Sequence, residues 1–223
     1  MTLEEYLGDW MRVIDEKELS KTLYNVWHLY ATKDINPAQG DIFRAFSLCP
    51  YSDIKVVFLG QDPYPQKGVA TGVLFGNDVN ISEDNLSPSL KIVKEAVINY
   101  EISHNTITFD QTLESWARQG ILMINSALTV EVNKVGSHSI LWRPFIGSLL
   151  RNLSETNPGL IYVLFGSQAA TFKPYIMSGT IIKVPHPAYH ARTGTKMNPQ
   201  LFIDINKELK SKYGTIIEWY HEY

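Results

Sequence analysis

The segment that most constrains this chain is an apolar run, Val56 to Leu59, followed at once by Gly60-Gln61-Asp62-Pro63-Tyr64-Pro65. Consecutive apolar residues predict a strand buried on both faces, as in a parallel sheet. The two prolines then exclude a helix and bias the residues before them, Asp62 and Tyr64, toward extended backbone. We therefore expect a carboxylate and a phenol to be held rigidly at the carboxyl end of a central strand, where open α/β sheets bind ligands.

Further apolar runs alternate with helical patterns, which favours a parallel sheet with right-handed crossovers. Strands are expected at residues 54–59, 121–124, 160–165 and 180–184. Helices are expected at residues 3–15, 17–33, 42–46, 90–100, 111–119, 142–153, 173–177 and 199–213. Before residue 90, Ser87 is expected as an N-cap and Pro88 as the first helical residue. We predict an α/β fold, a short four-stranded parallel sheet flanked by helices, in one domain over residues 1–223.

Polar side chains follow three of the expected strands. Gln61 and Asp62 come after the first, Asn125 after the second and His186 after the last. Because the carboxyl ends of parallel strands share one face of a sheet, we expect these side chains to converge. Each also has an ordinary structural interpretation: a turn-stabilising aspartate, an asparagine that satisfies loop backbone, or a hydrogen-bonded core histidine.

Size and composition fit one well-buried domain, with 223 residues of which 44% are hydrophobic. A net charge of −3 does not indicate nucleic-acid binding, although a sum over the surface hides local basic faces. The single cysteine, Cys49, predicts a reducing cytoplasm and no cysteine-rich metal site. The acidic start and the lack of an apolar run of about 20 residues predict neither a signal peptide nor a membrane span.

The hexapeptide GQDPYP resembles the water-activating motif of the family 1 uracil-DNA glycosylases, which is usually GQDPYH. Other blocks similar to that family follow in its order, which is hard to obtain by chance. They are residues 42–50, Pro88-Ser89-Leu90-Lys91, residues 116–130, Leu164-Phe165-Gly166-Ser167 and His186-Pro187-Ala188. The resemblance implies the same sheet fold and a monofunctional glycosylase that uses no metal and no cofactor.

Cleavage of the N-glycosidic bond develops positive charge on the sugar and negative charge on the leaving base. An anion near the sugar and donors near the base oxygens therefore favour the reaction. The resemblance implies that Asp62 is that anion and the general base for water, and that His186 donates to a base oxygen. Asn125 offers both the acceptor and the donor that uracil N3–H and O4 require.

Around the base, the resemblance implies stacking by Phe75, exclusion of the thymine methyl group by Tyr64, and hydrogen bonds from Gln61. Alone, Phe75 would more often be a core residue. The resemblance also implies that two short loops press on DNA phosphates. Their residues are Pro88, Ser89, Gly166 and Ser167, although both serines are also plausible helix caps.

The chain departs from the family pattern at the DNA-facing side. Pro65 replaces a histidine, and Ala188 replaces a serine. The loop after His186 lacks the leucine wedge that fills the space left by the flipped base, and offers Tyr189, His190 and Arg192 instead. His190 is nearest the wedge position, so we predict it and Arg192 as DNA contacts. Residues 76–78 and the acidic Glu83-Asp84 replace a more neutral loop.

The leading interpretation is a uracil-DNA glycosylase that flips uracil from single- and double-stranded DNA and initiates base excision repair. We expect it to be monomeric and to have a proteinaceous uracil-DNA glycosylase inhibitor as a partner. A second interpretation is a glycosylase-fold DNA-binding accessory protein with weak or no catalysis, which the altered loop motivates. A third interpretation is a different α/β enzyme, such as a hydrolase or a nucleotide-binding protein. The sequence shows neither the glycine-rich phosphate loop nor the nucleophile elbow that would support it.

Overall fold

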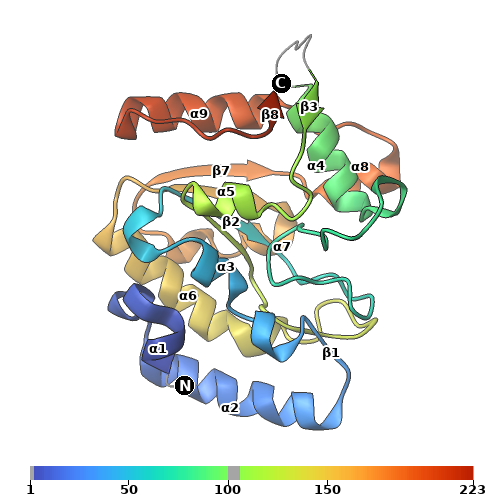
Figure 1. Cartoon of the computed structure of the whole chain (residues 1–223). Helices are drawn as coiled ribbons and strands as arrows, with labels where there is room; N and C mark the ends of the chain where they lie inside the picture. The colour runs from blue at the N-terminus through green and yellow to red at the C-terminus, as the bar shows by residue number, and fades with distance from the viewer. Residues whose placement is uncertain (1–2, 100–105, 223) are drawn as a thin grey trace.

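A parallel sheet in the order β4-β2-β6-β7 forms the centre of the molecule (Figure 1). The computed structural model describes residues 3–99 and 106–222. The sheet strands are β2 (Val56–Gly60), β4 (Ile121–Asn125), β6 (Ile161–Phe165) and β7 (Thr180–Val184). The predicted four-stranded parallel sheet is confirmed, and so is its α/β class.

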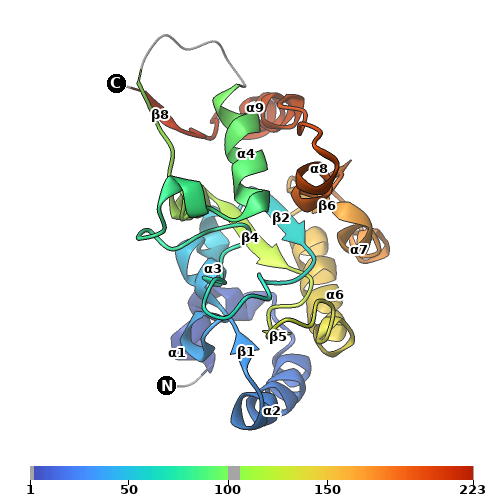
Figure 2. The ribbon, with the colours of Figure 1, turned by 90° about the vertical axis from the view of Figure 1, so that its right-hand side faces the viewer.

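Helices cover both faces of this sheet because successive strand residues point to opposite sides. Val57 and Leu59 pack in one apolar core with α1, α2, α3 and α6, whereas Val56 and Phe58 pack in a second core with α4, α5 and α9 (Figures 1 and 2). The helices are α1 (Leu3–Leu7), α2 (Glu16–Thr32), α3 (Arg44–Leu48), α4 (Pro88–Ile98), α5 (Glu114–Arg118), α6 (Ser139–Thr156), α7 (Gly166–Ala170), α8 (Pro187–Thr193) and α9 (Gln200–Tyr213). In the described part of the chain, no helix has the length and apolar character that crossing a membrane requires.

Short elements complete the fold, and the short strands among them were not predicted, because two-residue strands leave no periodic pattern. β1 (Ile35–Asn36) pairs antiparallel with β5 (Val130–Glu131), and β3 (Ile107–Thr108) pairs antiparallel with β8 (His221–Glu222). The 3-10 turns are η1 (Gly8–Arg12), η2 (Gln39–Asp41), η3 (Tyr51–Asp53), η4 (Glu83–Asn85) and η5 (Lys173–Tyr175).

Four helix predictions need correction. The helix expected over 173–177 is the short 3-10 turn η5. The helix expected over 3–15 divides at Gly8, whose positive φ of 55° ends α1 before the η1 turn. The segments beginning at Gly166 and Pro187, expected as loops, are the helices α7 and α8. The α4 helix begins at Pro88 as predicted and runs to Ile98; the predicted end at Tyr100 lies outside the described residues.

The carboxyl ends of the strands lie at a common edge because all four run parallel. Gly60 at the end of β2 is in register with Asn125 at the end of β4, and Phe165 of β6 is in register with Val184 of β7. Figure 2 faces this edge, where α7 and α8 follow their strands directly. The edge therefore collects the residues that follow each strand.

Candidate active site

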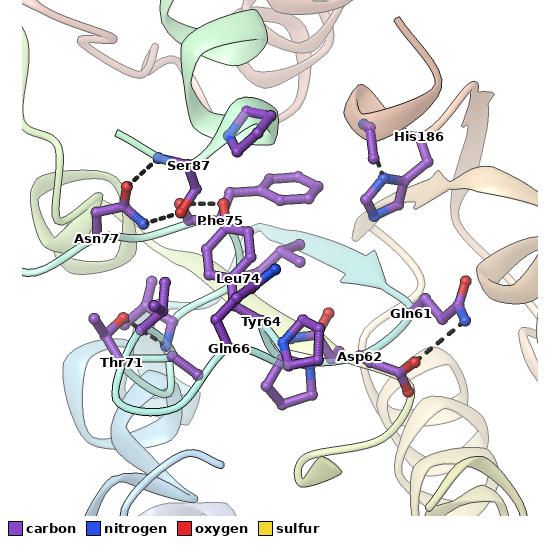
Figure 3. A pocket seen from close by; sticks show the side chains of 18 of the residues that line it. Gln61, Asp62, Tyr64, Gln66, Thr71, Leu74, Phe75, Asn77, Ser87 and His186 are labelled. Atoms are coloured by element: carbon purple, nitrogen blue, oxygen red, sulfur yellow. Dashed lines mark hydrogen bonds between the residues drawn. The ribbon is translucent and has the colours of Figure 1, made fainter. Parts of the chain in front are cut away.

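A cavity of about 1080 Å³ opens at the carboxyl edge of the sheet (Figure 3). It is lined by Asp62 after β2, Asn125 at the end of β4 and His186 after β7. The structure therefore brings together the three polar side chains that the topology predicted would converge. Within residues 3–99 and 106–222, no group of three or more histidine, cysteine or acidic side chains has the arrangement of a metal site.

The carboxylate of Asp62 is held on one oxygen and free on the other. Its Oδ2 accepts hydrogen bonds from the Gly136 backbone N–H at 2.7 Å and from Gln61 Nε2 at 3.2 Å. Its Oδ1 is buried and has no partner. Burial raises the pKa of Asp62 above its usual 3.8, against the hydrogen bonds from Gly136 and Gln61. A positioned acceptor of this kind is able to orient and deprotonate a water molecule.

Sequence reasoning missed Gly136 as a partner of Asp62. Gly136 is 74 positions away along the chain, and its contribution is a backbone N–H that any residue type carries. No sequence pattern announces such a contact. Through this hydrogen bond, the loop before α6 helps to fix the position of the Asp62 carboxylate.

The structure gives Gln61 a contact that was not predicted. Its amide donates to Asp62 (Figure 3), while its carbonyl oxygen accepts from Ala127 N–H and Ser126 Oγ, both at 3.0 Å. These bonds fasten the β2 loop to the segment after β4. Gln61 therefore positions Asp62, and its predicted contact with a base stays a prediction.

The side-chain amide of Asn125 lies against Gly60, where a larger residue would displace it. A Cβ atom on Gly60 would lie 2.6 Å from Asn125 Oδ1, closer than real contacts permit. Asn125 is 9% exposed and its Oδ1 has no hydrogen-bond partner. A buried unpaired amide oxygen is costly, so its environment favours a ligand that donates to it.

His186 is fixed in one tautomer by the start of α8. Its Nδ1 accepts from the Ala188 N–H at 3.1 Å as an N-cap, so the ring proton of the neutral imidazole lies on Nε2. Burial, with the positive charge of Arg192, lowers the pKa of His186 to about 4. At neutral pH the ring is therefore uncharged and offers one N–H as a donor.

Tyr64 and Phe75 form an apolar wall of the cavity. The Tyr64 hydroxyl donates to the Phe75 carbonyl at 3.0 Å, and Asn36 Nδ2 donates to the Tyr64 carbonyl at 3.0 Å. The Phe75 ring meets His186 edge-on, with centroids 5.4 Å apart, and meets Phe165 in the same way at 5.2 Å. Both aromatic rings are thus held in place from several sides.

Comparison with known proteins agrees with this geometry. The family model described as the uracil DNA glycosylase superfamily matches residues 46–210. The chain belongs to this superfamily. A uracil-DNA glycosylase of Campylobacter jejuni is 39% identical over 191 residues, covering 83% of this chain and 79% of the relative. Another, of Fusobacterium nucleatum, is 32% identical over 225 residues and covers 95% of each chain.

Solved structures in the same superfamily share the fold. A crystal structure of mimivirus uracil-DNA glycosylase has a TM-score of 0.74 at 24% identity, and covers 97% of this chain and 91% of its own. A mimivirus UNG variant in complex with UGI has a TM-score of 0.73 at 24% identity, with 97% and 93% coverage. At this identity the likeness bears on the fold alone.

The predicted DNA-side residues of this superfamily member fall into two groups. Pro88, Gly166, Ser167 and Arg192 line the cavity. Ser89 does not line the part of the cavity that the structure describes; it is 5% exposed, whereas the preceding Ser87 does line it. Ser87 occupies the predicted N-cap position of α4, but its side chain makes no capping bond.

The prediction of His190 as the wedge is not supported by its position. His190 is 9% exposed, and its Nδ1 is hydrogen-bonded to Thr195 Oγ1 at 2.9 Å. The reason is that residues 187–193 form α8, which turns this side chain inward. The neighbouring Tyr189 is 48% exposed and lines the cavity. Pro187 after the capping His186, and Gly194 at the helix end with φ of 65°, are the sequence signals that predict this helix.

Proposed function

We propose that this chain is a monofunctional uracil-DNA glycosylase of the family 1 type, which initiates base excision repair. The superfamily match and the curated relatives support uracil excision. The GQDPYP motif supports the family 1 assignment. The observation that carries the proposal is the cavity that holds the free Asp62 Oδ1 together with Asn125 and the neutral His186.

In this proposal an extrahelical uracil enters the cavity and stacks on Phe75. Asn125 reads its N3–H and O4 edge, and Tyr64 stands against C5. Asp62 stabilises the positive charge on the sugar and accepts a proton from the attacking water. His186 Nε2–H donates to the base oxygen that becomes negative as the bond breaks. These groups supply the chemistry without a step that calls for a metal.

On the DNA side, we propose Tyr189 as the residue that fills the space left by the flipped base. It is the exposed aromatic side chain of α8 beside the cavity, and apolar wedges inserted between bases are a common device in DNA distortion. Ser167 and the backbone at Pro88 and Gly166 are proposed phosphate contacts, together with Arg192.

A uracil-release assay tests the proposal. We expect the purified chain to release uracil from single- and double-stranded oligonucleotides in the presence of a chelator. A DNA-binding accessory protein would bind both oligonucleotides without releasing uracil. The same assay tests a further proposal, that a proteinaceous inhibitor such as UGI, seen with a mimivirus relative, inhibits this chain too.

A further inference from the structure

A buried asparagine lies behind the two aromatic side chains that would enclose the base. Asn77 is 2% exposed. Its Nδ2 donates to Ser87 Oγ at 2.8 Å, and its Oδ1 accepts from the Ser87 N–H at 2.7 Å (Figure 3). Its own N–H donates to the Gln111 carbonyl at 2.9 Å. Nδ2 also donates to the Gly76 carbonyl at 3.2 Å. The two shorter bonds of the side chain both go to Ser87, so they hold Ser87 in place.

This pair of hydrogen bonds joins two segments that are ten positions apart. One segment, residues 73–77, carries Phe75; the other is the start of α4 at Ser87 and Pro88. Because Ser87 turns its hydroxyl to Asn77, it does not cap α4. An N-cap serine usually bonds to the first turn of its own helix, whereas Ser87 bonds to Asn77 in the segment 73–77.

The Tyr64 hydroxyl is bonded to the same segment that Asn77 belongs to. Burial raises the pKa of Tyr64. The hydroxyl therefore keeps its proton and donates to the Phe75 carbonyl at 3.0 Å. Ser87 is thus bonded to Asn77, and Tyr64 to Phe75 two residues earlier, so residues 73–77 connect the four side chains in one unit.

The backbone of Phe75 needs such support. Its φ is +62°, in the left-handed region that residues other than glycine seldom adopt. Such a conformation persists only where the surroundings hold it. Two interactions provide this constraint. The Tyr64 hydroxyl donates to the Phe75 carbonyl, and the side chain of Asn77, two residues further on, is bonded to Ser87.

We propose that Asn77 and Ser87 are positioning residues for base selection, and that they fix the distance between the Tyr64 wall and the Phe75 ring. The inference rests on the proposed function of the cavity. A compliant apolar pocket discriminates poorly against one added methyl group, so exclusion of thymine requires a wall that does not yield. The Asn77–Ser87 bridge makes the wall rigid.

The test uses bases that differ only in size at C5. Affinities for free uracil, 5-fluorouracil and thymine are measured by NMR titration for the wild type and for Asn77→Ala, Ser87→Ala and Tyr64→Phe. Each variant loses a link of the unit while keeping the Phe75 ring. We expect the preference for uracil over thymine to fall by about tenfold or more in all three.

Two controls separate positioning from general stability. Asn80→Ala removes an exposed asparagine of the same loop, which is bonded to Asp78, and should keep the wild-type preference. Ser87→Thr retains the hydroxyl and should restore the preference that Ser87→Ala loses. If Asn77→Ala fails to fold, the Tyr64→Phe and Ser87 variants still decide the question.

Folded variants with the wild-type preference would overturn the inference, even if their melting temperatures are lowered. Failure of the proposed function looks different. In that case the wild type would bind uracil in preference to thymine and yet release none from DNA, and the comparison of C5 substituents would still test the role of Asn77.

Discussion

At the residue scale, the environment of each ionisable group sets the pH range of the proposed reaction. Asp62 must be ionised to act, and burial raises its pKa above 3.8. His186 must be neutral to keep its cap on α8, and its pKa is lowered to about 4 from 6.5. We therefore expect the rate of uracil release to stay level from neutral pH down through pH 6.5 and to fall only in more acidic solution.

The lowered pKa of His186 also makes the free energy of unfolding depend on pH. Between pH 6.5 and about 4, His186 is protonated in the unfolded chain and neutral in the folded chain. The contribution of His186 therefore lowers the free energy of unfolding as the pH falls through this window, and is constant below it. An NMR titration of His186 checks both points; a midpoint near 6.5 would contradict them.

At the scale of elements, α8 separates two neighbouring aromatic side chains. It packs against α4, with His190 inside and Tyr189 outside. We predict that Tyr189→Ala lowers excision from a U·A pair more than from single-stranded DNA, because flipping costs least where the base is unpaired. Tyr189→Leu should retain most duplex activity.

His190→Ala serves as the matched comparison on the same helix. It removes the bond to Thr195 and should lower the melting temperature while affecting both DNA substrates alike. If instead His190→Ala selectively impairs the duplex substrate and Tyr189→Ala does not, the original assignment of the wedge to His190 holds and the one proposed from the structure is wrong.

The elements also show what the sequence was able to predict. Strands β2, β4 and β6 are buried on both faces, so their apolar runs are unambiguous and their carboxyl ends place Asp62 and Asn125 correctly. The orientation of side chains on α8 depends on whether residues 187–193 are helical. The family resemblance led us to expect a loop there. The hold of Gly136 on Asp62 and of Asn77 on Ser87 depends on tertiary contacts that no local pattern encodes.

At the scale of the whole molecule, many basic side chains are already paired with acidic ones. Lys33 and Lys134 share Glu131, and Lys67 pairs with Asp34. Lys94 pairs with Glu83, and Lys196 with Glu95. These pairs and the net charge of −3 reduce the positive charge that the molecule offers to DNA phosphates. Arg192, which lines the cavity, has no ion pair among the described residues.

We therefore predict a shallow dependence of DNA affinity on salt. Each phosphate neutralised contributes about −0.9 to the slope of log K against log[salt] on duplex DNA, so a slope between about −1 and −2 is expected. Fluorescence anisotropy with a short duplex measures it. Arg192→Gln should reduce the slope by about 0.9, while Lys207→Gln on α9 should leave it unchanged. A slope steeper than about −4 would contradict this prediction.

The most direct test of the account compares the wild type with Asp62→Asn in uracil release and in DNA binding. The amide keeps the shape of the side chain but loses the charge and the ability to accept a proton. We predict that the wild type releases uracil with chelator present, and that Asp62→Asn is slower by about 10²–10⁴ while it binds the oligonucleotide as tightly. Release by Asp62→Asn at the wild-type rate, or no release by the wild type, would contradict the account.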